Sequence, residues 1–295
     1  ILMRNDGHNY IESSLDYCHA GLFEEACALL EEASNDNPMR GYYLAWYYQQ
    51  AGNEDNMQSV RSQAAQSPAD YGFPNRIECV LALTMAMEKN PDDARAPYYL
   101  GNFLYAHYRY DEAITSWELS QTLDPNFPTV CRNLGLAYVN KQNDLQKGLA
   151  SYEQAFQLDP TDARIFFELD QLQKKLNQPI EQRLTRMEAN RELVDQRDDL
   201  TIEYVTLLNL VGRNHDALNI LTVRRFHPWE GGEGKVTGQY VLSLVELAKQ
   251  ELQAGNFHNA IEYLQRTQQY PHNLGEGRLA NAQHKHVDYY LGCAY

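Results

Sequence analysis

The sequence predicts an all-α fold, an α-α superhelix in which antiparallel helix pairs follow one another along the chain. The pairs Leu100-Gly101 and Leu134-Gly135 lie 34 residues apart, and Pro125 and Pro160 lie 35 apart, which is the length of a two-helix repeat. Between the prolines and the Leu-Gly pairs, apolar residues recur with helical period. The one extra residue in the second proline spacing falls near Asn143. Two copies of one helical hairpin therefore stand side by side in the middle of the chain.

The same frame extends over most of the 295 residues, so we expect a single solenoid over residues 1–295. Complete repeat units are expected at about 7–37, 38–68, 94–127, 128–162, 198–225 and 239–271. Residues 75–91 form a half unit whose first helix is replaced by a loop at 71–74. Residues 163–197 are a degenerate unit without the small crossing residues, and we expect longer, less regular helices there. A truncated unit begins at 285–295, and residues 226–238 are an insert.

Three kinds of residue define each unit physically. Small residues allow two helices to cross closely, and they are Ala26, Gly101, Ala113, Gly135 and Ala260. Glycines at the turn between the helices supply the positive φ of a helix C-cap, and they are Gly21, Gly52, Gly212 and Gly255. Prolines end the second helix because proline cannot continue it, and they are Pro38, Pro91, Pro125 and Pro160.

This pattern resembles the tetratricopeptide family over nearly the whole chain. One copy has Leu100, Gly101, Leu104, Ala113, Trp117 and Pro125, and the next has Leu134, Gly135, Tyr138, Gly148, Tyr152, Ala155 and Pro160. Both follow the family's order of Leu-Gly, small residue and closing proline, and the aromatic position of the pattern holds Leu104 in the first copy and Tyr138 in the second. The resemblance implies a concave surface that binds proteins or peptides.

A narrower resemblance lies in the stretches at 71–76, 98–102 and 226–235, read YGFPNR, YYLGN and FHPWEGGEGK. They look like the C-terminal helical part of large uncharacterised bacterial proteins. In those proteins an N-terminal β-rich domain is suspected of links to carbohydrate. The chain also opens at Ile1 without a start Met and stops within a helical pattern, so we expect it to be part of a longer polypeptide.

Composition excludes several classes of partner. The net charge of −15 opposes binding to nucleic acid and to acidic membrane surfaces, which need clustered Lys and Arg. No apolar run approaches the length of a membrane span. The five cysteines form no CxxC pair, which favours neither disulfides nor zinc and fits a reducing, cytoplasmic location. His284-x-His286 cannot share a helix face, and we expect no metal and no cofactor.

The insert RFHPWEGGEGKVTG raises the question of a phosphate loop. A P-loop needs G-x-x-x-x-G-K-[ST], but Trp229 stands in place of the first glycine and Val236 in place of the Ser or Thr. We therefore expect no nucleotide binding and no catalytic residues. Either Phe226 and Trp229 fold back as an apolar plug, or the insert is a docking surface. The candidate docking residues are Phe226, His227, Trp229, Glu230, Glu233 and Lys235.

The first helices of the repeats offer a second candidate site, an aromatic groove for an extended peptide. Tyrosine and arginine give contact area and directional bonds at low entropic cost. The candidate residues are Tyr42, Tyr43, Trp46, Arg95, Tyr98, Tyr99, Asn102, Tyr105, Arg132, Asn133 and Arg164. The competing interpretation is that half of these tyrosines belong to the core between repeats. Glu168 would oppose a peptide carboxylate beside Arg164.

Two functions follow from the sequence. The first is a non-catalytic scaffold that binds a protein or peptide, and we expect this partner to be the N-terminal part of the same polypeptide. The alternative is an accessory domain of a carbohydrate-related enzyme whose catalytic part lies outside this chain.

Overall fold

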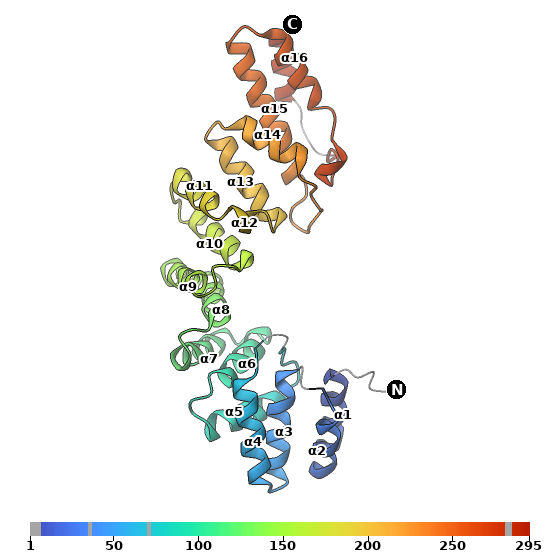
Figure 1. Cartoon of the computed structure of the whole chain (residues 1–295), viewed down its shortest axis with the longest axis vertical. Helices are drawn as coiled ribbons and strands as arrows, with labels where there is room; N and C mark the ends of the chain where they lie inside the picture. Colours follow the sequence, from blue (N-terminus) through green and yellow to red (C-terminus); the bar gives the residue numbers. More distant parts are fainter. Residues whose placement is uncertain (1–6, 35–36, 70–71, 281–284) are drawn as a thin grey trace. The chain divides into compact units, whose positions relative to one another are not determined.

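The structure, a computed structural model, describes residues 7–34, 37–69, 72–280 and 285–295. Within these ranges all regular structure is helical and no residue lies in a strand, so the predicted all-α solenoid class is confirmed. The contacts divide the chain into two compact units, Ile1–Asp159 (unit 1) and Pro160–Tyr295 (unit 2). Each unit is a stack of helical hairpins (Figure 1).

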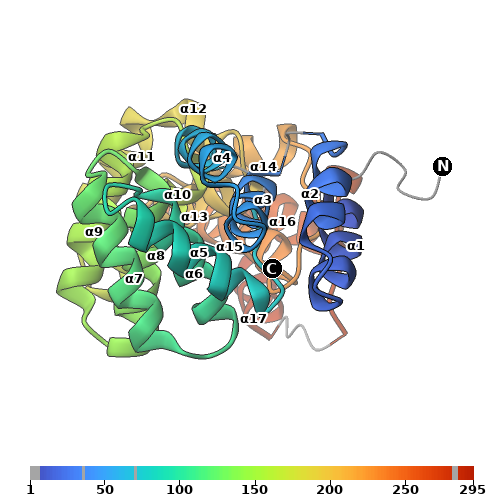
Figure 2. The ribbon, with the colours of Figure 1, turned by 90° about the horizontal axis from the view of Figure 1, so that it is seen from below.

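Unit 1 contains five successive stretches of paired or single helices. Its helices are α1 (Gly7–His19), α2 (Phe23–Glu31), α3 (Pro38–Gln50), α4 (Glu54–Gln66), α5 (Glu78–Lys89), α6 (Arg95–Ala106), α7 (Tyr110–Leu123), α8 (Pro128–Ala137), the π-helical turn η1 (Tyr138–Gln142) and α9 (Leu145–Leu158). Helices joined by short turns pack as pairs, α1 on α2, α3 on α4, α6 on α7 and α8 on α9. Figures 1 and 2 show α1 lying beside α2 in two directions of view.

The turns between paired helices have the predicted left-handed backbone. Gly21 and Gly52 have φ of +76° in unit 1, and Gly212 and Gly255 have φ of +80° and +78° in unit 2. One proline behaves differently from the prediction. Pro38 does not end α2, which stops at Glu31, but occupies the first turn of α3, where its missing N–H costs no hydrogen bond.

The small crossing residues sit where large aromatic rings press against the helix. A Cβ added at Gly101 would lie 2.4 Å from Nε1 of Trp117, and one added at Gly135 would lie 2.8 Å from Cδ2 of Tyr152. Real side chains do not approach so closely, so glycine is required at both positions. The aromatic residue of the second helix therefore fills the space that glycine leaves on the first.

The extra residue near Asn143 is absorbed without disturbing the stack. Residues 138–142 form a π-helical turn, and Asn143 ends it with φ of +53°. The Asp144 N–H donates to the Tyr138 carbonyl at 2.9 Å. A wider turn accommodates one added residue in a helix, which leaves α9 in register against α8.

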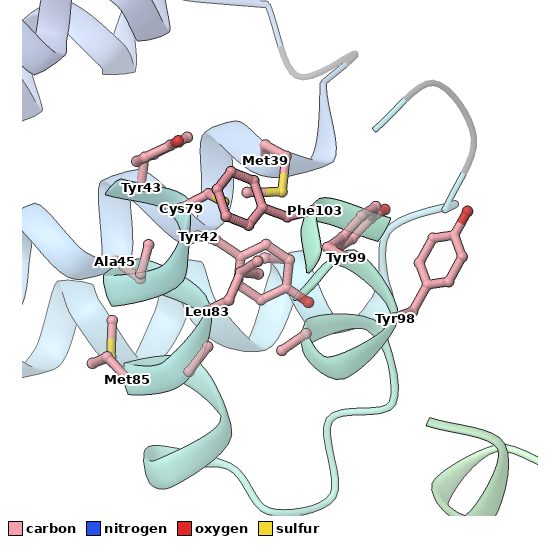
Figure 3. Close-up of a cluster of buried hydrophobic side chains, with 14 of the residues drawn as sticks. Met39, Tyr42, Tyr43, Ala45, Cys79, Leu83, Met85, Tyr98, Tyr99 and Phe103 are labelled. Atoms are coloured by element: carbon pink, nitrogen blue, oxygen red, sulfur yellow. The ribbon is translucent and has the colours of Figure 1, made fainter. Parts of the chain in front are cut away.

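Residues 75–91, expected as a half unit, contribute the single helix α5. It packs on both α3 and α6, and Cys79, Leu83 and Ala86 are completely buried there. Figure 3 shows Cys79 and Leu83 among the rings of Tyr42, Tyr99 and Phe103. Of the expected loop, Tyr71 lies outside the described residues, and Gly72 packs so closely on Tyr99 that a Cβ would lie 2.5 Å from its ring.

Unit 2 begins with the degenerate region. Its helices are α10 (Ala163–Lys175), α11 (Ile180–Ala189), α12 (Arg191–Val194), α13 (Asp198–Leu210), α14 (Asn214–Val223), α15 (Lys235–Gln253), α16 (Phe257–Arg266), the 3-10 turn η2 (His272–Leu274) and α17 (Lys285–Ala294). The helices at 163–197 are irregular, but they are not longer than the others, because Asn177 with φ of +55° breaks the segment. The helix expected from 239 starts at Lys235, so the insert is shorter than predicted.

Candidate functional site

Four tyrosines predicted to line a groove lie in the core of unit 1. The exposed fractions are 0% for Tyr42 and Tyr99, 2% for Tyr43 and 7% for Tyr98. Residues buried to this degree cannot contact a partner, so the groove prediction is wrong for them. For Tyr42, Tyr43 and Tyr99 the physical reason is α5, which packs directly on α3 and α6. The Tyr98 ring lies instead 4.8 Å from that of Phe127.

The hydroxyl of Tyr42 has a structural partner inside this core. It donates to the Asp93 carboxylate at 3.1–3.2 Å, and that carboxylate also accepts from the N–H groups of Arg95 and Ala96. Burial raises the pKa of Asp93 above its ordinary value, although these hydrogen bonds act in the opposite direction. Tyr42 therefore ties α3 to the start of α6.

The other predicted groove residues of unit 1 are partly buried and already engaged. Trp46 and Tyr105 pack against the core cluster of unit 1, and the Tyr105 ring lies 5.3 Å from that of Trp117. The Arg95 guanidinium lies 3.8 Å above the ring of Phe127, and its Nη1 is 3.3 Å from Asp124. These contacts join α6 to α7 and to residues 124–127, which precede α8.

A series of hydrogen bonds joins three of the predicted groove residues. Asn102 Oδ1 accepts from Trp117 Nε1 at 3.1 Å and from Asn133 Nδ2 at 3.2 Å, and Arg132 Nη1 is 3.4 Å from Asn133 Oδ1. Arg164 belongs to unit 2, where it pairs with Glu168 at 3.2 Å. The Glu168 carboxylate thus lies beside the arginine that a peptide carboxylate would need.

Hydrogen bonds and close packing attach the insert to the rest of unit 2. Phe226 is 2% exposed, and its N–H donates to the Asn273 carbonyl at 2.7 Å. The Asn273 amide donates to the carbonyls of Leu221 and Arg224, both at 2.8 Å. A Cβ at Gly275 would lie 2.5 Å from the Phe226 carbonyl oxygen. Phe226 is therefore a plug, locked by the loop that follows α16.

Two carboxylates from distant parts of the chain complete this attachment. Asp198 accepts from the Arg224 guanidinium at 2.7 and 2.9 Å and from the N–H of His227 at 2.9 Å. Burial would raise the pKa of Asp198, but the hydrogen bonds from His227 and Arg224 outweigh burial and hold it below its ordinary value. The other carboxylate, Glu276, accepts from Gly234 N–H at 2.8 Å and Thr237 N–H at 3.2 Å.

Glu276 binds the backbone N–H groups that a phosphate loop would use to bind an anion. The N–H groups at the start of a helix are the usual anion-binding groups of such loops. At the start of α15 these groups bind the carboxylate of the chain's own Glu276, which also accepts from the Thr237 hydroxyl at 3.1 Å. The Gly-Lys sequence therefore marks a helix start capped by an internal anion.

Trp229 stands between two cavities. Its indole lies on Gly232, where a Cβ would be 2.1–2.5 Å from three ring atoms, and the side chain is only partly buried. On one side is a cavity of about 250 Å³ (the insert cavity). On the other is a groove of about 570 Å³ (the unit 2 groove). Trp229 and Glu230 line both.

The unit 2 groove is lined by the first helices of three successive hairpins and by the insert. The lining residues are Phe167, Gln171 and Lys174 of α10, Asp199, Ile202, Glu203 and Thr206 of α13, Lys235, Gly238 and Gln239 of α15, and Trp229, Glu230, Gly231 and Gly234 of the insert. Sequence reasoning identified Lys235 but missed the other helical members. Phe167 and Gln171, Ile202 and Thr206, and Lys235 and Gln239 are each spaced by four residues, which places each pair on one helix face. That spacing was a usable signal.

A buried ion network fixes one wall of the groove. Arg183 donates to both oxygens of Asp170, at 3.0 and 2.6 Å, and to Glu203 at 2.9 Å. Lys174 Nζ donates to Glu203 at 2.7 and 3.0 Å. Burial would raise the pKa of Glu203, but Lys174 and Arg183 outweigh it and hold that pKa below its ordinary value. Glu203 is therefore ionised, and it orients the half-exposed Lys174 ammonium at the groove.

Another network orients an amide on the opposite wall. The buried Asn209 donates from Nδ2 to Gln239 Oε1 at 2.9 Å, and its own Oδ1 accepts from Ser243 and Asn214, both at 3.0 Å. The Gln239 carbonyl oxygen is thereby held toward Asn209. Its amino group is available as a donor at the groove surface.

Within the described ranges no three His, Cys, Asp or Glu residues are grouped so that they could hold a metal ion. The same ranges contain no helix that is long and apolar enough to cross a membrane. His284, one of the two histidines considered in the sequence, lies outside the described residues.

No family model matches the sequence. Solved structures of low sequence identity are similar to about two thirds of the chain. YrrB, described as a TPR protein with an unusual peptide-binding site, is 21% identical with a TM-score of 0.47, over 66% of this chain and 95% of YrrB. TTC0263 of Thermus thermophilus, described as a thermophilic TPR protein, is 18% identical with a TM-score of 0.38, over 68% and 98%. MamA from Desulfovibrio magneticus RS-1 is 19% identical with a TM-score of 0.37, over 65% and 97%.

Proposed function

We propose that this chain is a non-catalytic module that binds an extended peptide segment of a partner protein in the unit 2 groove. The observation that carries the proposal is the groove itself. Its volume of about 570 Å³ lies within the range of roughly 300–1,000 Å³ typical of ligand sites. Three helices and a fixed insert line it, so it exists before any ligand arrives.

The groove's chemistry suits a peptide backbone and side chains. Phe167, Ile202 and Trp229 offer apolar contact area, while Gln171, Thr206 and Gln239 offer hydrogen-bonding groups. Preformed polar groups bind with less loss of conformational entropy than mobile ones, and Gln239 and Lys174 are both held by buried networks. A peptide would therefore find apolar surface and fixed donors along one line of helices.

The carboxylates of the groove support a binding role over a catalytic one. A general acid at neutral pH needs a pKa raised toward that pH. The pKa of Glu203 is shifted the other way by Lys174 and Arg183, which hold this carboxylate ionised. Asp199, another carboxylate of the lining, forms an ion pair with Arg197 at 2.6 Å.

The finer expectation is that the peptide comes from the N-terminal part of the same polypeptide. A tethered segment needs little intrinsic affinity, because a short flexible linker supplies an effective concentration near millimolar. The insert supports this proposal through three charged residues, Glu230, Glu233 and Lys235, which are exposed.

A peptide-display selection on the whole chain tests the groove. Thr206→Trp fills the groove from α13, and Thr185→Trp is the matched control on the exposed face of α11, because both hydroxyls bond the carbonyl four residues earlier. We expect selected peptides to bind wild type and Thr185→Trp equally and to lose at least ~10-fold in affinity for Thr206→Trp. Equal binding by both variants, with unchanged circular dichroism, would refute the groove.

A further inference from the structure

The insert cavity on the other side of Trp229 is distinct from the groove in its charge. It is lined by His227, Pro228, Trp229, Glu230, Gly232, Glu233, Val236, Leu274 and Glu276. This lining includes three glutamates and no lysine or arginine. The one basic residue, His227, is already bonded through Nδ1 to Asp198 at 3.1 Å. The cavity therefore presents negative charge to whatever enters it.

Two of the three glutamates have no hydrogen-bond or ion-pair partner among the described residues. Glu276 is bound to the start of α15. Glu230 and Glu233 are exposed and form no hydrogen bond or ion pair with any residue in the part of the chain that the structure describes. Elsewhere in unit 2, Asp170, Asp198 and Glu203 each have cationic partners. Two carboxylates beside one cavity are thus left to bind a cation from outside.

The rest of the cavity wall is largely apolar. The Trp229 indole packs against Gly232, and Val236 and Leu274 are 2% and 1% exposed. An indole face attracts a cation placed over it, and arginine is the most frequent partner in proteins. The volume of about 250 Å³ is below the range of whole small-molecule sites, so it suits one long side chain.

We propose that the insert cavity receives an arginine side chain of the peptide that lies in the unit 2 groove. The guanidinium stacks on the Trp229 indole and pairs with Glu230 and Glu233. Trp229 and Glu230 line both spaces, so a backbone in the groove can send one side chain past the indole into the cavity. This inference rests on the proposed function and adds the chemistry of the partner.

Arginine fits this wall better than lysine for a geometric reason. Its guanidinium is planar, stacks on aromatic rings and can bond two carboxylates at once through its fork of donors. The lysine ammonium is more strongly hydrated and lacks a flat face. We expect arginine to be preferred and lysine to bind more weakly at the same place.

NMR of the tryptophan indole N–H groups tests the cavity directly on the whole chain. The chain has three tryptophans, and Trp229→Phe identifies the Trp229 signal, while Trp46 and Trp117 serve as internal references. The probe is N-acetyl-arginine amide, with the isosteric but uncharged N-acetyl-citrulline amide as its control. We expect a saturable shift of the Trp229 signal with a dissociation constant on the order of millimolar, and no saturable shift with the citrulline compound.

A pair of matched variants tests the carboxylates. The double variant Glu230→Gln, Glu233→Gln should weaken arginine amide binding by at least ~10-fold, the loss expected for charge-assisted hydrogen bonds. Glu25→Gln, which removes one exposed carboxylate on α2 in unit 1, should leave binding unchanged. Equal affinity in the double variant and wild type, or equal shifts by arginine and citrulline amides, overturns the proposal. A saturable Trp229 shift by methyl β-glucoside but not by arginine amide also overturns it, in favour of a sugar subsite.

Replacing arginine by citrulline within a selected peptide separates this inference from the proposed function. A peptide that depends on Thr206 but is indifferent to the replacement leaves the groove function standing and overturns the arginine pocket. A Trp229 signal that responds to arginine amide as expected, with no peptide that depends on Thr206, supports the pocket and overturns the groove. A peptide that loses affinity both with Thr206→Trp and on replacement of its arginine by citrulline supports the groove and the arginine pocket.

Discussion

Replacing Gly101 by alanine should destabilise unit 1 strongly although it adds one methyl group. That group would lie 2.4 Å from Nε1 and 2.5 Å from Cδ1 of Trp117. The Trp117 side chain is 2% exposed, and its Nε1 donates to the Tyr98 carbonyl at 3.2 Å and to Asn102 at 3.1 Å. The indole cannot move away without losing these hydrogen bonds.

The magnitude follows from three effects. Overpacking a core costs about 1–3 kcal/mol, and leaving a buried donor unsatisfied costs about 1–3 kcal/mol. Alanine's better helix propensity offsets up to about 1 kcal/mol. We expect the free energy of unfolding to fall by about 1–5 kcal/mol. For a unit of 159 residues, this lowers Tm by roughly 2–20 °C.

Thermal unfolding followed by tryptophan fluorescence measures this change, because Trp46 and Trp117 both report on unit 1. Gly238→Ala in α15 is the matched control, since a Cβ there meets nothing within 4 Å. The control should unfold at the same temperature or be stabilised by about 0.5–1 kcal/mol. A Gly101→Ala variant that unfolds like wild type would show that α6 and α7 are not packed through Trp117.

Three further predictions concern other parts of the chain. At pH 8 iodoacetamide should label the exposed Cys293 and spare the other four thiols, which are buried. Burial protects them from the reagent and raises the pKa of Cys27 and Cys79 to about 12. Mass spectrometry should show one adduct on the folded chain and five in denaturant. Glu276→Ala should remove the cap of α15, cost about 0.5–2 kcal/mol and speed amide hydrogen exchange at Gly234 and Thr237, while exposed Glu233→Ala should not. The pKa of Asp198 is lower in the folded chain than its ordinary value of about 3.9, so its contribution to stability is present above that value and lost as pH falls through the folded pKa. Acid should therefore release the insert, which should change the fluorescence of Trp229. The Asp198→Asn variant should not show this acid transition. If the variant shows the wild-type transition, another group controls the release of the insert.

The sequence alone determined the helical hairpins and their turns. Period, small residues and turn glycines are local signals, because a helix pair joined by a short turn packs mainly against its sequence neighbours. Thus Gly21 and Gly212 have the expected left-handed backbone, and the residue added near Asn143 appears as a local π-helical turn. The insert was also visible, since four glycines in eight residues fit no helix.

Only the tertiary structure decided which surfaces remain open. Local spacing places Tyr42 and Tyr99 on helix faces that would be exposed in a regular array of repeats. The single helix α5 of the half unit packs on α3 and α6, and both tyrosines are buried. The insert's geometry depends on Asp198, Asn273 and Glu276, which lie 26 to 52 residues from the groups they bind. Such long-range hydrogen bonds leave no periodic trace in the sequence, since one carboxylate or amide on any facing loop can form them. For the same reason the two spaces beside Trp229 emerged only when three helices and two loops met in space.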